Sequence, residues 1–245
     1  MNLKFVVAIM LKDLRVALKR KGLVIGLLVF PLILAIGLPM VLTISGSRGG
    51  GMPASVLPQL LSSFQFFFVI GSVTLPTAIA AFSLVGEKIE RSLEPLLATP
   101  VSDSEILVGK SLAAWLPPVA AAGIGNIVFM VFADLQTQKT LGYLYFPNPT
   151  ALMVLFVVIP LSAMVSVGLS VLVSSRVRDA RTAQQISSIL ALPFAGIYIT
   201  TEVGLIALNV PGMLVLAGIL AGLVAILFVL ARATFKREEI LTRWK

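Results

Sequence analysis

The segment GEKIERSLEPLLATPVSDSEILVGK, residues 86–110, is the one long charged stretch that lies between two runs too hydrophobic for water. Glu87 and Arg91 form an i,i+4 pair with the acid first, which is the favourable order on an isolated helix. Leu93 and Leu97 lie at helical spacing and give the segment a small apolar patch. The pattern predicts a short amphipathic bend held just outside a membrane.

Start and stop signals for helices are dense in the second half of this segment. Pro95 suits the first turn of a short helix, and Pro100 ends it. Ser102 and Glu105 have the spacing of a capping box, so a new helix is expected there that runs on past Lys110. A solvated connecting loop would also be charged, but this density of signals favours a structured surface.

The composition places the chain among all-α polytopic membrane proteins. Hydrophobic residues make up 58% of the sequence and charged residues only 12%, far from the balance of soluble domains. The chain has no cysteine and no histidine, which excludes disulfides and imidazole catalysis and leaves zinc without its usual ligands.

Charge-free runs predict six membrane spans in a single transmembrane domain, residues 1–245. We place these spans at residues 22–44, 59–85, 111–133, 151–173, 182–203 and 213–231. Prolines are expected to kink the first span at residues 31 and 39 and to break the third at residues 117 and 118. Residues 86–110 then form a cytoplasmic connection and residues 232–245 a charged cytoplasmic tail.

Residues 1–21 predict an amphipathic helix that lies in the plane of the lipid headgroups. Its expected apolar face consists of Leu3, Val7, Met10, Leu14, Ala17 and Leu18, and its expected polar face carries Lys4, Lys12, Arg15 and Lys19. A secretory signal peptide would have a shorter basic region and a shorter apolar run.

The distribution of cations predicts the topology. Of the 19 Lys and Arg residues, only Arg48 and Lys139 fall in the two loops expected on the outer side, Ser45–Pro53 and Asp134–Thr150. This bias places both termini and the 86–110 connection in the cytoplasm. The excess of basic residues thus orients the chain in the membrane and contacts anionic lipid, and nucleic-acid binding is not expected.

The sequence lacks the residues that enzymatic chemistry would need inside the spans, so we predict no catalytic, cofactor-binding or metal-binding residue. Gly109, Lys110 and Ser111 resemble the end of a phosphate-binding loop, but residue 104 is Ser where that motif needs Gly. Glu202 is the only ionisable group near a span that suggests a role, and we interpret it as a candidate outer gate.

The same segment resembles the signature of ABC-2 type permeases, the membrane subunits of ATP-binding-cassette exporters. The resemblance is carried by Glu87–Arg91, by LEPLLATPVS at residues 93–102, and by Ile106, Leu107, Gly109 and Lys110. It implies that residues 86–110 contain the coupling helix, which docks on an ATPase. The residues expected to make that contact are Glu87, Glu90, Arg91, Leu93, Glu94, Leu97, Thr99 and Pro100.

The resemblance further implies a subunit of an ATP-driven exporter in the cytoplasmic membrane, with two cytosolic ATPases that hold the ATP and Mg. A second permease subunit, identical or related, would complete the path. Two alternatives remain open at the level of the sequence: a secondary carrier that works alone and uses Glu202, and a non-transporting membrane anchor that recruits a cytosolic partner.

Overall fold

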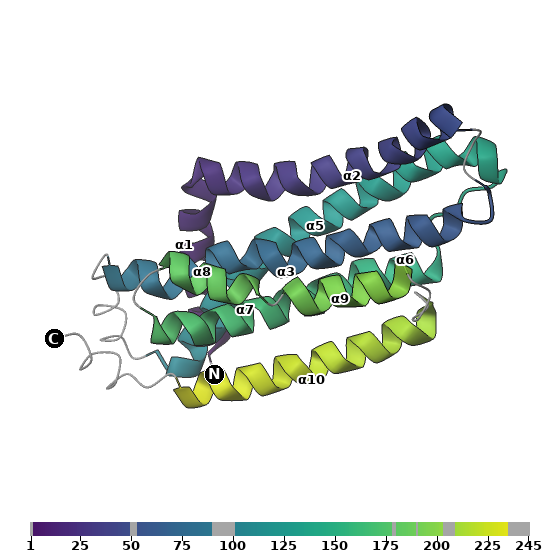
Figure 1. Ribbon diagram of the computed structural model, residues 1–245. Coiled ribbons are helices and arrows are strands. Elements are labelled where there is room, and N and C mark those ends of the chain that lie inside the picture. Colours follow the sequence, from purple (N-terminus) through teal and green to yellow (C-terminus); the bar gives the residue numbers. More distant parts are fainter. Residues whose placement is uncertain are drawn as a thin grey trace.

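The computed structural model describes residues 2–49, 53–89, 101–177, 180–189, 191–202 and 209–234 (Figure 1). Over these ranges it contains helices and connecting turns and no strand. The helices are α1 (Leu3–Lys19), α2 (Lys21–Gly49), α3 (Leu57–Ile89), α5 (Asp103–Leu141), α6 (Pro149–Met153), the π-helical turn η1 (Val154–Val158), α7 (Ile159–Arg176), α8 (Ala180–Ser188), α9 (Ala191–Glu202) and α10 (Val210–Thr234).

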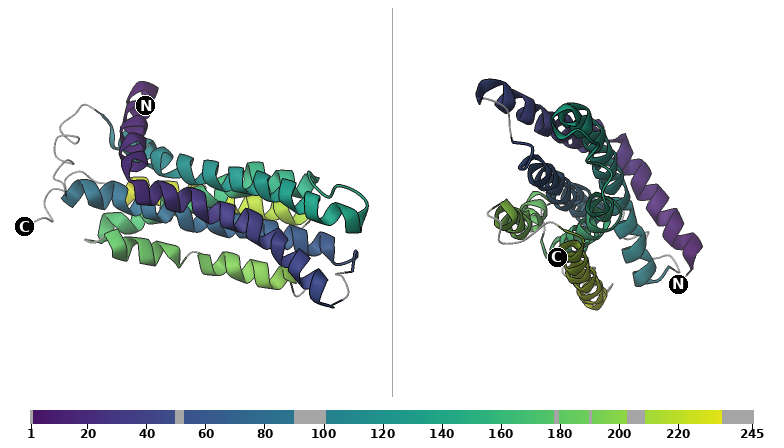
Figure 2. Two further views of the ribbon diagram at one scale, coloured as in Figure 1. Left: turned by 90° about the horizontal axis from the view of Figure 1, so that it is seen from above. Right: turned by 90° about the vertical axis from the view of Figure 1, so that its right-hand side faces the viewer.

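The long helices form an up-and-down bundle, and α1 crosses one end of it (Figures 1 and 2). Helices α3, α5 and α7 contact one another at the centre. Helix α2 lies on one side against α5, and α10 lies on the other side against α7. We call the end that α1 crosses the α1 end; α3 and α7 finish there, and α5 begins there.

Five of the described helical segments are long and apolar enough to cross a membrane, which makes the chain an all-α polytopic membrane protein. They are Lys21–Leu42, Leu57–Ala80, Asp103–Leu141, Pro149–Ser174 and Val210–Arg232. Backbone groups have no water to bind in hydrocarbon, so continuous helices are the expected solution.

The predicted fifth span is not a single helix. Its residues form α8 and α9, which follow one another alongside α3 (Figure 1). The interruption falls just before Pro193, which has no N–H to donate to the preceding turn. Pro193 instead occupies the first turn of α9, where that missing donor is tolerated.

The prediction that prolines break the third span is wrong, since α5 runs without interruption through Pro117 and Pro118. Helix α2 is likewise continuous through its two prolines. Both helices also extend beyond the predicted spans, α2 to Gly49 and α5 to Leu141, so the two connections at that end are shorter than expected. Neighbouring helices stabilise such proline-containing turns in a membrane.

A proline does alter the backbone just before α7. Pro160 cannot donate a hydrogen bond, and the preceding residues Val154–Val158 adopt a π-helical turn in which the N–H of Ile159 bonds to the carbonyl of Val154. The carbonyl of Pro160 accepts a hydrogen bond from the indole N–H of Trp115 at 2.9 Å, which ties α7 to α5.

Small polar residues form the contact between α7 and α3. Serines recur at every fourth position along α7 and are fully buried; they are Ser162, Ser166, Ser170 and Ser174. The Ser162 hydroxyl lies 2.6 Å from that of Ser72 on α3, and Ser166 donates to the backbone carbonyl of Val73. Small residues allow helices in lipid to approach closely and to add hydrogen bonds between them.

Helices α2 and α5 approach each other closely at Gly125. A Cβ atom at this position would lie 2.5 Å from the Cβ of Pro31 and 3.1 Å from the ring of Phe68. Two residues earlier, a Cβ at Gly123 would meet only Leu155, at 3.7 Å, which is an ordinary contact.

We therefore expect Gly125→Ala to lower the free energy of unfolding in detergent by about 1–3 kcal/mol, because Pro31 has to move. Gly123→Ala is the matched control and should leave the melting temperature nearly unchanged. Equal melting temperatures for the two variants would contradict this account of the α2–α5 contact.

Candidate functional site

The first turn of α5 is held by the predicted capping box, which the structure confirms. The Ser102 hydroxyl accepts a hydrogen bond from the Glu105 N–H at 3.4 Å, and the Ser102 N–H donates to Glu105 Oε2 at 2.9 Å. The box fixes the direction in which the chain enters α5 from the preceding segment.

Glu105 also joins α5 to α1. Its Oε1 accepts a hydrogen bond from the backbone N–H of Asn2, and the Asn2 side chain caps α1 by accepting from the Lys4 N–H at 3.1 Å. The Glu105 carboxylate is 6% exposed and lies in the first turn, before the uncharged part of the helix. The hydrogen bond from Asn2, followed by that from Ser102, lowers the pKa of Glu105.

One turn further along α5, Gly109 and Lys110 hold the middle of α1. A Cβ at Gly109 would lie 3.0 Å from both the Cβ of Ile9 and the carbonyl oxygen of Val6, so only glycine fits without a shift. Lys110 Nζ lies 3.2 Å from Asp13 Oδ2, and the Lys110 side chain is 2% exposed. We call these contacts, together with the Glu105 bond, the α1–α5 clamp.

The face of α1 that packs on α5 differs from the predicted apolar face. Val6, Ile9 and Ala17 are buried, and only Ala17 belongs to the predicted set. Leu3 and Leu18 are exposed, at 69% and 50%. The prediction assumed that only lipid covers the apolar residues of α1. In the structure α1 also packs on α5, in the orientation that brings Asp13 to the buried Lys110.

The side chains predicted to contact an ATPase all lie outside the described part of the chain. Glu87 is in the last turns of α3, and its side chain lies outside the described part of the chain. Glu90, Arg91, Leu93, Glu94, Leu97, Thr99 and Pro100 also lie outside the described residues. Glu202 is the last residue of α9, and its side chain is not described.

The sequence did not predict the Asp13–Lys110 pair or the bond from Asn2 to Glu105. A signal was present, because Asp13 is the one acid in an otherwise basic segment and Gly109–Lys110 belongs to the signature. Nothing in the residue pattern connects positions that lie about a hundred residues apart.

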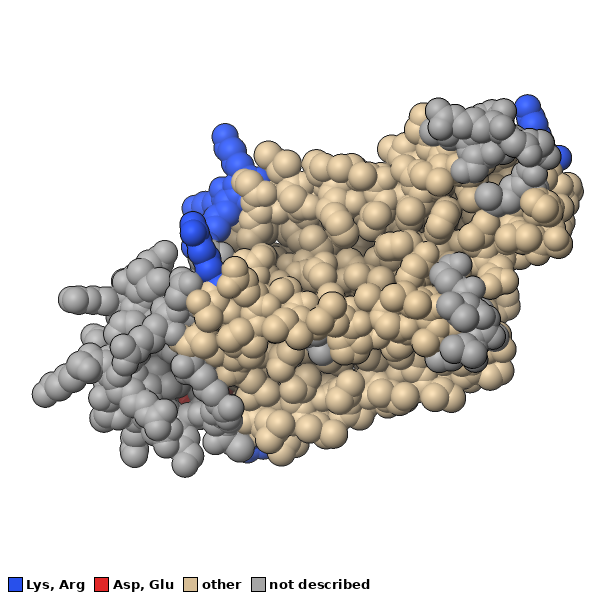
Figure 3. All heavy atoms as spheres, in the orientation of Figure 1, with Lys and Arg blue, Asp and Glu red and all other residues tan. Residues whose placement is uncertain are grey.

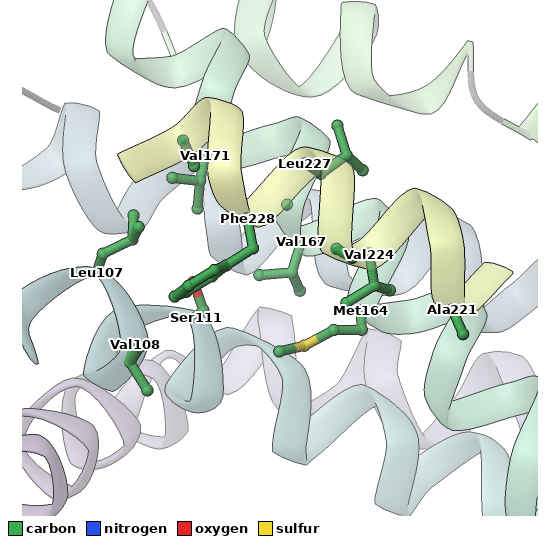
Figure 4. Close-up of a pocket in the computed structure, with 13 residues that line it drawn as sticks. Leu107, Val108, Ser111, Met164, Val167, Val171, Ala221, Val224, Leu227 and Phe228 are labelled. Carbon is green, nitrogen blue, oxygen red and sulfur yellow. The ribbon is translucent and has the colours of Figure 1, made fainter. Parts of the chain in front are cut away.

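A cavity of about 280 Å³ lies beside the start of α5, between α7 and α10 (Figure 4). Phe228 points into it from α10 toward Ser111 on α5, and Met164 lines it from α7 (Figure 4). All other lining residues are aliphatic or glycine, so the cavity suits an apolar group and offers no acid–base chemistry.

The described residues contain no group of three or more acidic side chains that could hold a metal ion. Asp134 is buried at the far end of α5, where its carboxylate accepts hydrogen bonds from the N–H groups of Tyr145 at 3.0 Å and Phe146 at 3.1 and 3.2 Å. Within the described chain, this carboxylate is therefore used to hold a loop.

A bundle of long apolar helices with a charged junction at one end defines a multi-pass membrane protein. Residues 50–221 match the family model described as ABC-2 family transporter protein. The chain thus belongs to the ABC-2 type permease family, as its signature predicted.

A curated relative supports the same assignment. The ABC transporter permease protein NatB of Bacillus subtilis (strain 168) is 28% identical over 218 residues, an alignment that covers 77% of this chain and 54% of NatB. The chain therefore spans about half the length of that relative.

Removing one partner of the clamp should loosen α1. We expect Asp13→Asn to destabilise the protein by up to about 3 kcal/mol, because the buried Lys110 ammonium then loses the charge of the Asp13 carboxylate. The double variant Asp13→Leu, Lys110→Met should recover part of that loss. Lys12→Met is the control, since the Lys12 side chain is half exposed and its Nζ lies 4.0 Å from Asp13 Oδ1. The melting temperature of this variant should match that of the wild type. A double variant less stable than Asp13→Asn would contradict a direct pair.

The Glu105 bonds predict a pH dependence. A carboxyl group whose pKa is lowered on folding stabilises the fold above its ordinary value of 4.5, and the contribution is lost as the pH falls through the lower folded value. Thermal unfolding of wild type and Glu105→Gln should therefore differ most near pH 7 and converge below pH 4.5. A difference that stays constant from pH 7 to pH 3 would contradict this role.

Proposed function

We propose that this chain is the permease subunit of an ATP-driven exporter, in which it forms the substrate path and couples to a separate cytosolic ATPase. Two permease subunits, identical or related, would surround the path, and two ATPase copies would supply ATP and Mg. The family assignment and the clamp support this proposal.

The observation that carries the proposal is the position of the connection between α3 and α5. Helix α3 reaches Ile89 and α5 begins at Asp103, both at the α1 end (Figure 1). The capping box fixes the start of α5, where this connection ends, and the clamp joins the same part of α5 to α1. A segment that joins two long helices can transmit a movement of a docked ATPase to those helices.

The chain would cross the membrane six times. Helices α8 and α9 together follow the length of the bundle beside α3, and we assign this pair as the fifth crossing (Figure 1). The α1 end also carries most of the cations in the sequence, so it would face the cytoplasm together with both termini.

The secondary carrier receives less support. Such a carrier needs an ionisable relay in its spans, and the described buried charges are engaged in structural contacts: Lys110 pairs with Asp13, and Asp134 holds the loop. The carrier interpretation then depends on Glu202. Gradient-driven flux by the chain reconstituted without any ATPase, lost in Glu202→Gln, would favour it over the exporter.

The docking role has a direct test. We expect the combined substitution Glu94→Arg, Leu97→Asp to reduce copurification with a candidate ATPase and to abolish substrate-stimulated ATP hydrolysis, because desolvated interface contacts cost at least about 1–2 kcal/mol each when lost. Leu144→Asp, an exposed residue at the opposite end, is the control and should retain both.

Unchanged binding and hydrolysis in the double variant would overturn the coupling role. Normal ATPase binding with no substrate-dependent hydrolysis in the wild type would instead favour the non-transporting anchor.

A further inference from the structure

A second cavity, of about 600 Å³, opens between α2, α3 and α8 near the α1 end. It lies beside the junction of α1 and α2, between α2 on one side and α3 and α8 on the other. We call it the α2 groove. Its lining residues are Arg20, Lys21, Gly22, Leu23, Gly26, Leu27, Phe30, Thr74, Leu75, Ala78 and Gln184.

The α2 groove has a charged mouth and an apolar length. Among its described lining residues, only Arg20 and Lys21, at the junction of α1 and α2, are charged, and both are exposed. Figure 3 shows Lys and Arg side chains gathered at that end of the bundle and an uncharged surface along its middle. An anion at the mouth would thus meet two cations, and none of the described lining residues is acidic.

Glycines keep the wall of the groove open. A Cβ atom at Gly22 or at Gly26 would meet no atom within 4 Å, so both positions face empty space on one side of α2. Phe30 is the last α2 residue of the lining, and its ring packs on α3, 3.1 Å from the position of a Cβ at Gly71. The groove therefore extends along α2 from Lys21 to Phe30.

The length of the groove matches one leaflet of a membrane. The nine steps along α2 from Lys21 to Phe30 correspond to about 14 Å, nearly half of a hydrocarbon core of about 30 Å. The cations then lie at the depth of the headgroups, and the apolar wall lies at the depth of the acyl chains.

We propose that the α2 groove binds an anionic phospholipid, with its phosphate at Arg20 and Lys21 and an acyl chain along Gly22, Gly26 and Phe30. Two cations at the headgroup distinguish this ligand from a zwitterionic lipid. The apolar wall distinguishes it from free phosphate. Its lining residues do not include any that are expected to contact an ATPase.

The test is lipid retention by the full chain, purified in detergent without an ATPase and measured by native mass spectrometry. The probes are phosphatidylglycerol, phosphatidylcholine with the same acyl chains, and glycerol phosphate without acyl chains. We expect the wild type to retain phosphatidylglycerol preferentially and glycerol phosphate not at all. Arg20→Gln with Lys21→Gln should reduce phosphatidylglycerol binding by roughly 5- to 30-fold.

Matched variants separate the groove from the rest of the surface. Gly26→Leu places a side chain in the groove at a position where a Cβ meets no atom within 4 Å, and it should also remove the bound phosphatidylglycerol. Gly37→Leu, another open position on α2 outside the groove, should not. Lys139→Gln, an exposed cation at the opposite end, should bind as the wild type does.

Equal retention of phosphatidylcholine and phosphatidylglycerol by the wild type would overturn the proposal. Full retention in Gly26→Leu would do the same, because the lipid would then lie elsewhere. Binding of glycerol phosphate as tight as that of the lipid would reduce the site to an anion site and would also contradict it.

Discussion

The uninterrupted helix α5 organises the bundle because it is longer than the membrane is thick. Its 39 residues correspond to about 58 Å, against a hydrocarbon core of about 30 Å. Both ends therefore project beyond the apolar region and carry polar groups that bind other parts of the chain. At one end Glu105 and Lys110 hold α1, and at the other end Asp134 holds the loop before α6.

The middle of the bundle follows a different rule. Helices surrounded by lipid gain little from burying apolar surface against each other, so their contacts depend on close packing and on hydrogen bonds. Gly125 allows α2 to approach α5, and the row of serines on α7 allows it to approach α3. Where small residues are not matched by a partner, as at Gly22 and Gly26, the helices separate and leave the α2 groove.

The last residues of the signature segment are part of the clamp. Gly109 and Lys110 resemble part of a nucleotide-binding loop, yet in the fold they hold α1 by close backbone contact and by an ion pair. The segment before them thus leads directly into a rigid junction of two helices. In the proposed exporter, a docked ATPase would act on this junction.

The sequence alone determined the membrane helices, the start of α5 and the family, each through a local pattern of residues. Long charge-free runs required membrane helices, the Ser102–Glu105 spacing gave the start of α5, and the signature gave the family. These features depend on hydropathy and on contacts within one turn, which a sequence displays directly.

Only the tertiary structure decided which face of α1 is buried, because that face is selected by Asp13 and its partner ninety-seven positions away. It also decided how the prolines act: neighbouring helices keep α5 continuous through Pro117 and Pro118, while the predicted fifth span divides before Pro193. The α2 groove likewise exists only because α2 and α3 diverge in space. Such features arise from contacts between distant segments, and the order of residues does not encode them locally.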